Sequence, residues 1–195
     1  SSDLEDLLTL AFSISHGQTG LVPVKVTFPE GITTRDMGDI LKKNLQDFDE
    51  DTFLALAKPE EGYLFPDTYF FLPGVSPKDV IARLKTNFDE RTKPLSDAIA
   101  AFGKPESDVI IMASILEKEG RTPETRRTIA GILWKRLKLG MPLQVDAAFG
   151  YIFGKDTYSP SGSDLDVDSP YNTYKYRGLP PGPIGNPGVE TIEDA

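Results

Sequence analysis

The chain has 195 residues, 39% of them hydrophobic, which is enough for one large domain or for one domain with a small appendage. Thirty acidic residues against twenty-one basic ones give a net charge of −9, so we expect no diffuse basic surface and no nucleic-acid partner. Cysteine is absent and His16 is the only histidine; this excludes cysteine-ligated zinc, multi-histidine metal sites and histidine-based triads, and we expect neither metal nor cofactor.

The first 58 residues are expected to form a small α+β module. A helix-like segment near Leu4–Phe12 precedes alternating apolar residues over 22–28, which predict a half-buried strand. Thr33 or Thr34 can cap the next helix, and a second short helix covers about residues 51–57. We expect the apolar stripes of these elements to form a small core of their own, and the module to contribute no chemistry.

The remaining residues, 59–195, are expected to form a second, helix-rich domain. An aromatic strand broken by Pro66 opens it, and four helices are predicted, from Pro77, over about 95–102, over 109–120 and from Pro123 to Gly140. Residues 159–168 are expected to be an acidic surface loop. The predicted fold class is therefore α+β.

The two ends of the chain and the length of its apolar segments indicate whether the chain crosses a membrane and whether it belongs to a longer protein. The longest apolar run, Val109–Ala113, is far shorter than the roughly 20 residues that cross a bilayer. Because the chain starts without methionine and stops at Ala195 in what resembles a helix start, we expect a soluble expressed fragment of a longer protein.

The segment from Asp168 to Gly188 is the most distinctive part of the chain. Its prolines fix φ and lack an N–H, and its glycines allow positive φ, so it predicts a shaped loop rather than a helix or strand. Tyrosines and an asparagine inside it favour a rigid wall of a binding site over a flexible linker. A structural turn packed on the core is the alternative.

Two acids end the apolar helix predicted over 109–120. Glu117 and Glu119 lie in its last turn, where carboxylates oppose the helix dipole. A glutamate at the mouth of an apolar pocket has its charged form disfavoured, which suits a general acid. The alternative is a solvated helix end with Lys118 between two exposed acids. Helical periodicity places Glu119 nearer the apolar centre than Glu117, so the residues alone leave both open.

Four sequence blocks together carry a family resemblance. They are Glu61–Tyr69, Ala113–Glu119, Arg136–Asp146 and Ser169–Gly188. In this order and spacing they resemble the signature blocks of the YceG-like (MltG) endolytic murein transglycosylases. The resemblance implies a LysM-like N-terminal module, here residues 1–58 and possibly incomplete at its start, followed by a mixed, helix-rich α/β catalytic domain, here residues 59–195, whose C-terminal part is expected to be truncated.

The resemblance also implies a reaction and a catalytic residue. Glu117, rather than Glu119, would be the catalytic acid of a lyase that cuts the β-1,4 bond between N-acetylmuramic acid and N-acetylglucosamine without water. Glu117 would protonate the leaving oxygen and then take the proton of the muramoyl C6 hydroxyl, which closes a 1,6-anhydro ring. Because this nucleophile is internal, no second carboxylate at glycosidase spacing is required.

Seven further residues are expected to bind substrate in one groove with Glu117. Aromatic faces and polar groups are what sugar recognition requires, and the residues that supply them are Glu61, Glu119, Gln144, Asp146, Tyr171, Asn172 and Tyr174. The alternative is that Tyr171 and Tyr174 fill the core beneath the loop. The chain departs from the family pattern at Val145, where a small hydroxyl residue is usual.

The resemblance implies partners and a location as well. Peptidoglycan glycan strands would be the substrate and penicillin-binding synthases the partners, with an N-terminal membrane helix outside this chain and the catalytic domain on the extracytoplasmic side. A non-catalytic peptidoglycan-binding scaffold of the cell-wall synthesis machinery is the alternative from another functional class.

Overall fold

The computed structural model describes residues 22–155 and 159–195. The helix-like segment expected near Leu4–Phe12 lies outside the described residues. The elements, in chain order, are β1 (Val24–Thr27), α2 (Thr34–Asn44), α3 (Glu50–Ala57), η1 (Lys58–Glu60), β2 (Thr68–Phe71), α4 (Pro77–Thr92), η2 (Lys93–Leu95), α5 (Ser96–Phe102), α6 (Glu106–Glu119), α7 (Pro123–Lys138), α8 (Ala147–Phe153), η3 (Asp164–Asp166) and α9 (Val189–Asp194).

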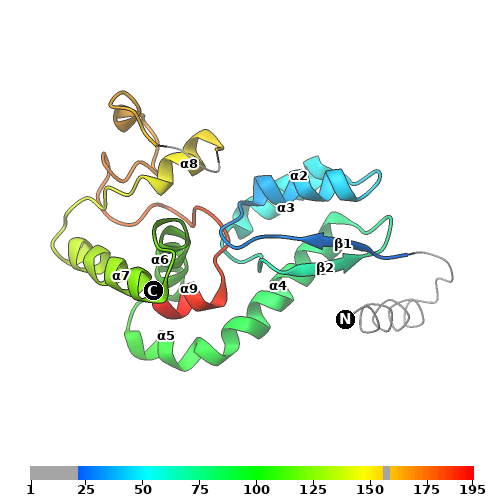
Figure 1. The fold of residues 1–195 in the computed structure, drawn as a ribbon, viewed down its shortest axis with the longest axis horizontal. Helices are drawn as coiled ribbons and strands as arrows, with labels where there is room; N and C mark the ends of the chain where they lie inside the picture. The colour runs from blue at the N-terminus through cyan, green and yellow to red at the C-terminus, as the bar shows by residue number, and fades with distance from the viewer. Residues whose placement is uncertain (1–21, 156–158) are drawn as a thin grey trace.

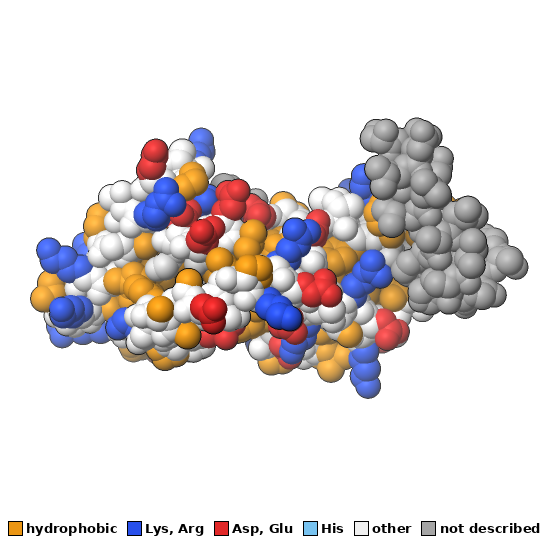
Figure 2. Space-filling model, turned by 90° about the horizontal axis from the view of Figure 1, so that it is seen from below, with side chains coloured by type: hydrophobic (Ala, Val, Ile, Leu, Met, Phe, Trp, Pro, Cys, Tyr) orange, Lys and Arg blue, Asp and Glu red, His pale blue; other side chains and the backbone are white. Residues whose placement is uncertain are grey.

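Helices dominate the described part of the chain, which confirms the predicted helix-rich α+β class. Figure 1 shows the sheet with α2 and α3 on one side of the molecule and α6, α7 and α9 on the other, with α4 and α5 running below. No described helix combines the length and apolar character needed to cross a membrane. On the face seen in Figure 2, acidic and basic side chains are interspersed among apolar ones.

The first half of the chain is built on one antiparallel strand pair. β1 pairs with β2 in the register Val24↔Phe71 to Thr27↔Thr68. The pleat turns Val26 into the core and leaves its two neighbours exposed. Thr33 caps α2, because its hydroxyl accepts the Asp36 N–H at 3.2 Å. The predicted strand and the helix that follows it are therefore confirmed.

The core of this half crosses the boundary expected at residue 58. Apolar side chains from both sides of it form one cluster, which includes Val26, Met37, Leu41 and Phe53 before the boundary and Leu64, Tyr69, Phe71 and Leu84 after it. The expectation of a core confined to the first 58 residues is wrong, because β1 finds its partner only in β2.

The second half is centred on α6. Every residue of α6 from Val109 to Leu116 is buried, because α7, α8 and α9 all pack against this helix. A helix that is apolar on all sides must be covered on all sides. The last turn of α6 emerges from this core, and that is where Glu117 lies.

The loop of residues 168–188 forms neither helix nor strand, as predicted. Figure 1 shows it passing from the α8 side past α6 to the start of α9. It also reaches back to the first half through an isolated antiparallel bridge between Ile32 and Asn186. The loop therefore links the two halves beside the end of α6.

Candidate active-site cleft

A cleft of about 890 Å³ lies where the two halves meet. Its walls are the start of α2, the end of α6, helix α8 and the loop around Ser169–Tyr171. Pockets of a few hundred to about 1,000 Å³ hold ligands of drug or oligosaccharide size. The cleft therefore has room for sugar residues next to the acids of α6.

Glu117 is half-buried at one side of this cleft. Its Oε2 accepts the backbone N–H of Gly188 at 2.9 Å. Gly31 lies against its stem, since a Cβ at that glycine would be 3.0 Å from Glu117 Cγ. Two backbone segments far away in the sequence thus fix the position of this carboxyl group.

Glu30 is a cleft residue that the sequence reasoning missed. Its carboxylate lies against Gly188, so that a Cβ at Gly188 would collide with it. Burial raises the pKa of Glu30, as do the negative charges of Glu117 and Glu190, while Arg126 opposes them. In the sequence, the signal for Glu30 was its place between Pro29 and Gly31, a pair typical of a turn. In the structure, Gly31 has a φ of 75°, so the chain does turn there.

Glu119 lies differently from Glu117. It is exposed, it lines the cleft, and its Oε1 accepts the Ala147 N–H at 3.2 Å at the start of α8. The inference from periodicity that Glu119 is nearer the apolar centre is wrong, because the turn at Gly31 and the segment at Gly188 cover Glu117 instead.

Glu61 is buried in the wall of the cleft, with 6% of its surface exposed. It accepts hydrogen bonds from Thr34 N at 3.0 Å, from Thr34 Oγ1 at 2.8 Å and from Asn186 Nδ2 at 2.9 Å. Burial raises the pKa of Glu61 to about 7, against the opposing effect of these donors. Its oxygens are thus engaged by the protein itself.

The titration of Glu61 makes stability depend on pH. Its pKa rises from an ordinary 4.5 to about 7, so the folded chain holds this proton more tightly than the unfolded chain does. The free energy of unfolding should therefore fall as the pH rises from about 4.5 through about 7, by about 3 kcal/mol for this group. Urea unfolding at about pH 5 and about pH 8 should show this loss in the wild type, and Glu61→Gln should remove it. Parallel profiles for the two proteins would contradict the assignment.

Two tyrosines form an aromatic wall. Tyr171 lines the cleft, as expected, and so does Tyr151, which was not predicted. Their ring centroids are 4.8 Å apart, with the ring planes tilted by 46°. Tyr171 also packs against the core around α6, so it serves both as a wall of the cleft and as part of the core's edge.

Asp146 and Tyr174 lie together beside α8. Asp146 lines the cleft, and the Tyr174 hydroxyl donates to Asp146 Oδ1 at 2.6 Å. The Tyr174 ring packs on Phe149, with centroids 5.8 Å apart. Tyr174 is therefore joined to the cleft through Asp146 and is not among its lining residues.

Two predicted groove residues lie elsewhere. Gln144 is exposed outside the lining of the cleft, and its backbone N–H donates to Thr173 O at 3.1 Å. Asn172 is fully buried, and its Nδ2 donates to Leu165 O and Val167 O at 2.8 and 2.9 Å. The expectation that Asn172 contacts substrate is wrong, because its amide holds the loop together.

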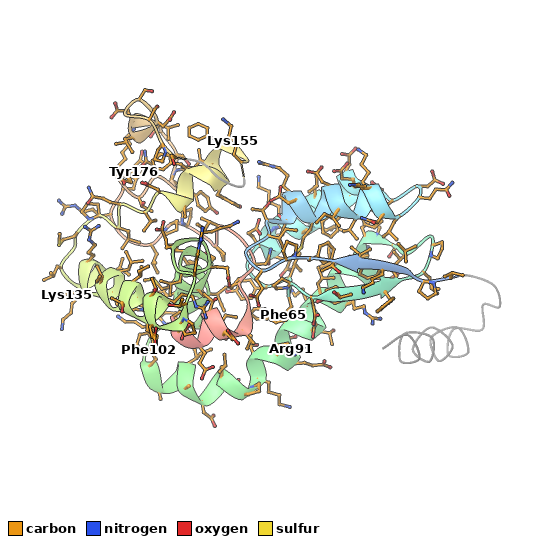
Figure 3. All side chains as sticks on the ribbon, viewed as in Figure 1. Phe65, Arg91, Phe102, Lys135, Lys155 and Tyr176 are labelled. Carbon is orange, nitrogen blue, oxygen red and sulfur yellow. The ribbon has the colours of Figure 1, made fainter. Side chains whose placement is uncertain are left out.

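Cationic side chains surround the acids of the cleft. They are Arg35, Lys58, Lys118, Arg121 and Lys155. Figure 3 shows Lys155 at the end of α8 on the side that faces α2, and Arg35 of α2 lies against the neighbouring Gly154. The start of α2 and the end of α8 are thus in contact at this end of the cleft. Within the described residues, no three His, Cys, Asp or Glu side chains are placed to hold a metal ion.

Comparison with known proteins identifies the family. The model of the YceG-like family matches residues 5–195. The chain belongs to the YceG-like family. It is 34% identical over 179 residues to the endolytic murein transglycosylase of Bacillus subtilis (strain 168), covering 91% of this chain and 46% of that protein. It is 36% identical over 140 residues to the enzyme of the same name from Streptococcus pneumoniae serotype 2, covering 69% of this chain and 25% of that protein.

The YceG-like chain therefore spans less than half the length of these curated relatives. A solved structure shares its fold over a greater extent. The crystal structure of a yceG-like protein from Listeria monocytogenes matches it with a TM-score of 0.82 at 30% identity, over 95% of this chain and 70% of that one. The arrangement of the two halves is thus shared with that protein.

Proposed function

We propose that this chain is the part of an endolytic lytic transglycosylase that cleaves the bond between N-acetylmuramic acid and N-acetylglucosamine in nascent peptidoglycan strands. One observation carries the proposal: Glu117 follows the buried stretch Val109–Leu116 of α6, lines a cleft of about 890 Å³ and accepts a hydrogen bond from a backbone amide there. The names of the relatives support the same reaction class.

The chemistry assigns two successive roles to one carboxyl group. With Oε2 held by the Gly188 amide, we assign proton transfer to Oε1 of Glu117. The protonated group would give its proton to the glycosidic oxygen as the C1–O bond breaks, which releases the N-acetylglucosamine hydroxyl. The resulting carboxylate would take the proton from the muramoyl C6 hydroxyl while that oxygen bonds to C1. The 1,6-anhydro ring closes, and Glu117 regains its proton.

The position of Glu30 favours a second candidate reaction, hydrolysis of the glycosidic bond. A glycoside hydrolase works with two carboxylates on either side of the bond, and Glu30 lies beside Gly188 close enough to Glu117 to be influenced by its charge. In the transglycosylase the nucleophile is part of the substrate, which gives it a high effective concentration. Glu30 is then free to act as an acceptor for sugar hydroxyls.

The location and the partners follow from family membership as proposals. The protein that carries this chain would be anchored by an N-terminal membrane helix and would act outside the cytoplasm beside penicillin-binding synthases. A LysM-like module that positions glycan strands would extend through β2, because β1 pairs with that strand.

Incubating the full chain with uncrosslinked glycan strands separates the enzyme from a scaffold. The products should be shorter strands that end in 1,6-anhydro-N-acetylmuramic acid, detected by mass spectrometry after digestion to disaccharides. Strands that are bound but keep their length would favour the non-catalytic scaffold instead.

A further inference from the structure

Asn186 is a fully buried side chain in the loop that precedes α9. Its Oδ1 accepts the N–H groups of Gly62 and Leu64 at 2.9 and 3.0 Å. Its Nδ2 donates to Ile32 O and to Glu61 Oε1, both at 2.9 Å. A carboxamide has two donor hydrogens and two acceptor lone pairs, so all four of its hydrogen-bonding positions are used.

The backbone of Asn186 makes two more of these links. Its N–H donates to Ile32 O at 2.8 Å, and its carbonyl accepts the Gly31 N–H at 2.7 Å. Gly185 comes so close to this turn that a Cβ there would be 2.5 Å from Gly31 O. Asn186 therefore joins three segments, at residues 31–32, 61–64 and 185–188, that are far apart in the sequence.

Both contacts that hold Glu117 start from these joined segments. Gly188, two residues after Asn186, donates its N–H to Glu117 Oε2 at 2.9 Å. Gly31, bonded to the Asn186 carbonyl, lies against Glu117 Cγ. Asn186 is not among the residues that line the cleft, so it can act on the reaction only through these neighbours.

We propose that Asn186 is the positioning residue of the catalytic acid, an inference that rests on the proposed function of Glu117. By tying the Gly31 turn to the Gly188 segment, Asn186 fixes the carboxyl group between them. The neighbours set the orientation of the amide, because Glu61 Oε1 and Ile32 O accept from its NH₂ group and the Gly62 and Leu64 amides require its oxygen. A misplacement of about 1 Å is enough to cost about 100-fold in rate.

Asn186→Asp tests the proposal with a nearly isosteric change. The variant keeps the oxygen that faces Gly62 and Leu64 but turns a second oxygen toward Glu61 Oε1 and Ile32 O. We expect kcat to fall by about 10- to 100-fold with KM nearly unchanged. Adding Glu61→Gln supplies an NH₂ group opposite the new oxygen, and we expect it to restore part of kcat.

Asn87→Asp is the matched control. Asn87 also donates its Nδ2 to a carboxylate, Asp67 Oδ2, at 3.2 Å, and to the Tyr69 hydroxyl, but it is not among the residues of the cleft. The control places two carboxylates side by side as Asn186→Asp does. It should lose stability while keeping its kcat.

A second readout does not depend on activity. Hydrogen exchange of the Gly188 amide should quicken in Asn186→Asp and stay unchanged in Asn87→Asp, because only the first change frees the amide from Glu117. If Asn186→Asp fails to fold, Asn186→Ser, which removes the amide group without adding a charge, carries both measurements with the same expected results. If the wild type does not cleave glycan strands, the proposed function is rejected. The exchange rate of the Gly188 amide then still tests whether Asn186 holds the Gly188 segment against Glu117. Unchanged Gly188 exchange, or equal losses of kcat in both aspartate variants, would overturn the positioning role.

Discussion

Glu117→Gln is expected to lower the rate of glycan cleavage by about 10²- to 10⁴-fold while the protein stays folded. Glutamine keeps the shape of the side chain and an oxygen that can accept the Gly188 N–H, but its amide is neither acidic enough to protonate the leaving oxygen nor basic enough to take the C6 hydroxyl proton. The measurement is the initial rate at which 1,6-anhydro ends appear, with thermal unfolding as a check on the fold.

Glu119→Gln is the control for this experiment. Glu119 lies in the same last turn of α6, but it is exposed and contacts the backbone of α8 rather than the Gly188 segment. We expect a much smaller loss of rate from it. Equal losses in the two variants, or a Glu117→Gln protein that cleaves at the wild-type rate, would remove Glu117 from the catalytic role.

Deleting residues 1–57 is expected to abolish cooperative folding of the rest of the chain. The deletion takes away β1, the strand with which β2 pairs. It also removes Val26, Met37, Leu41 and Phe53, which pack in one core with side chains that follow residue 58. Four such side chains contribute about 6 to 12 kcal/mol at about 1.5 to 3 kcal/mol each, which is comparable to the whole stability of a domain.

The deletion is checked by thermal unfolding followed by circular dichroism and by limited proteolysis. The full chain should show one sharp transition, and residues 58–195 alone should show none and be digested rapidly. A cooperative transition in the shortened chain would instead place an independent domain after residue 58, as the sequence first suggested.

Elements with strong local signals could be predicted from the sequence. Thr33 at the start of α2, Pro77 at the start of α4 and Pro123 at the start of α7 mark helices whose apolar stripes run over several turns. Helix α8 was missed because its seven residues provide less than two turns of periodicity. The shared core was missed because strand pairing between β1 and β2 leaves no local trace.

The candidate site could be predicted only in part. Family resemblance selected Glu117, whereas periodicity favoured Glu119, because a helical projection ignores the loops that cover each face. Glu30 and Asn186 escaped notice since their roles depend on distant contacts: Asn186 meets Ile32 across 154 positions and Glu117 meets Gly188 across 71. Asn172 was misassigned because a buried amide and a sugar-binding amide look the same in a sequence.

Cleavage of glycan strands in water enriched in heavy oxygen tests the central claim most directly. If Glu117 directs the attack of the muramoyl C6 hydroxyl, every new end will be a 1,6-anhydro ring without heavy oxygen, and Glu117→Gln will form almost none. Reducing ends that carry heavy oxygen would show that water is the nucleophile, which would contradict the transglycosylase mechanism and turn attention to the carboxylate pair of Glu30 and Glu117.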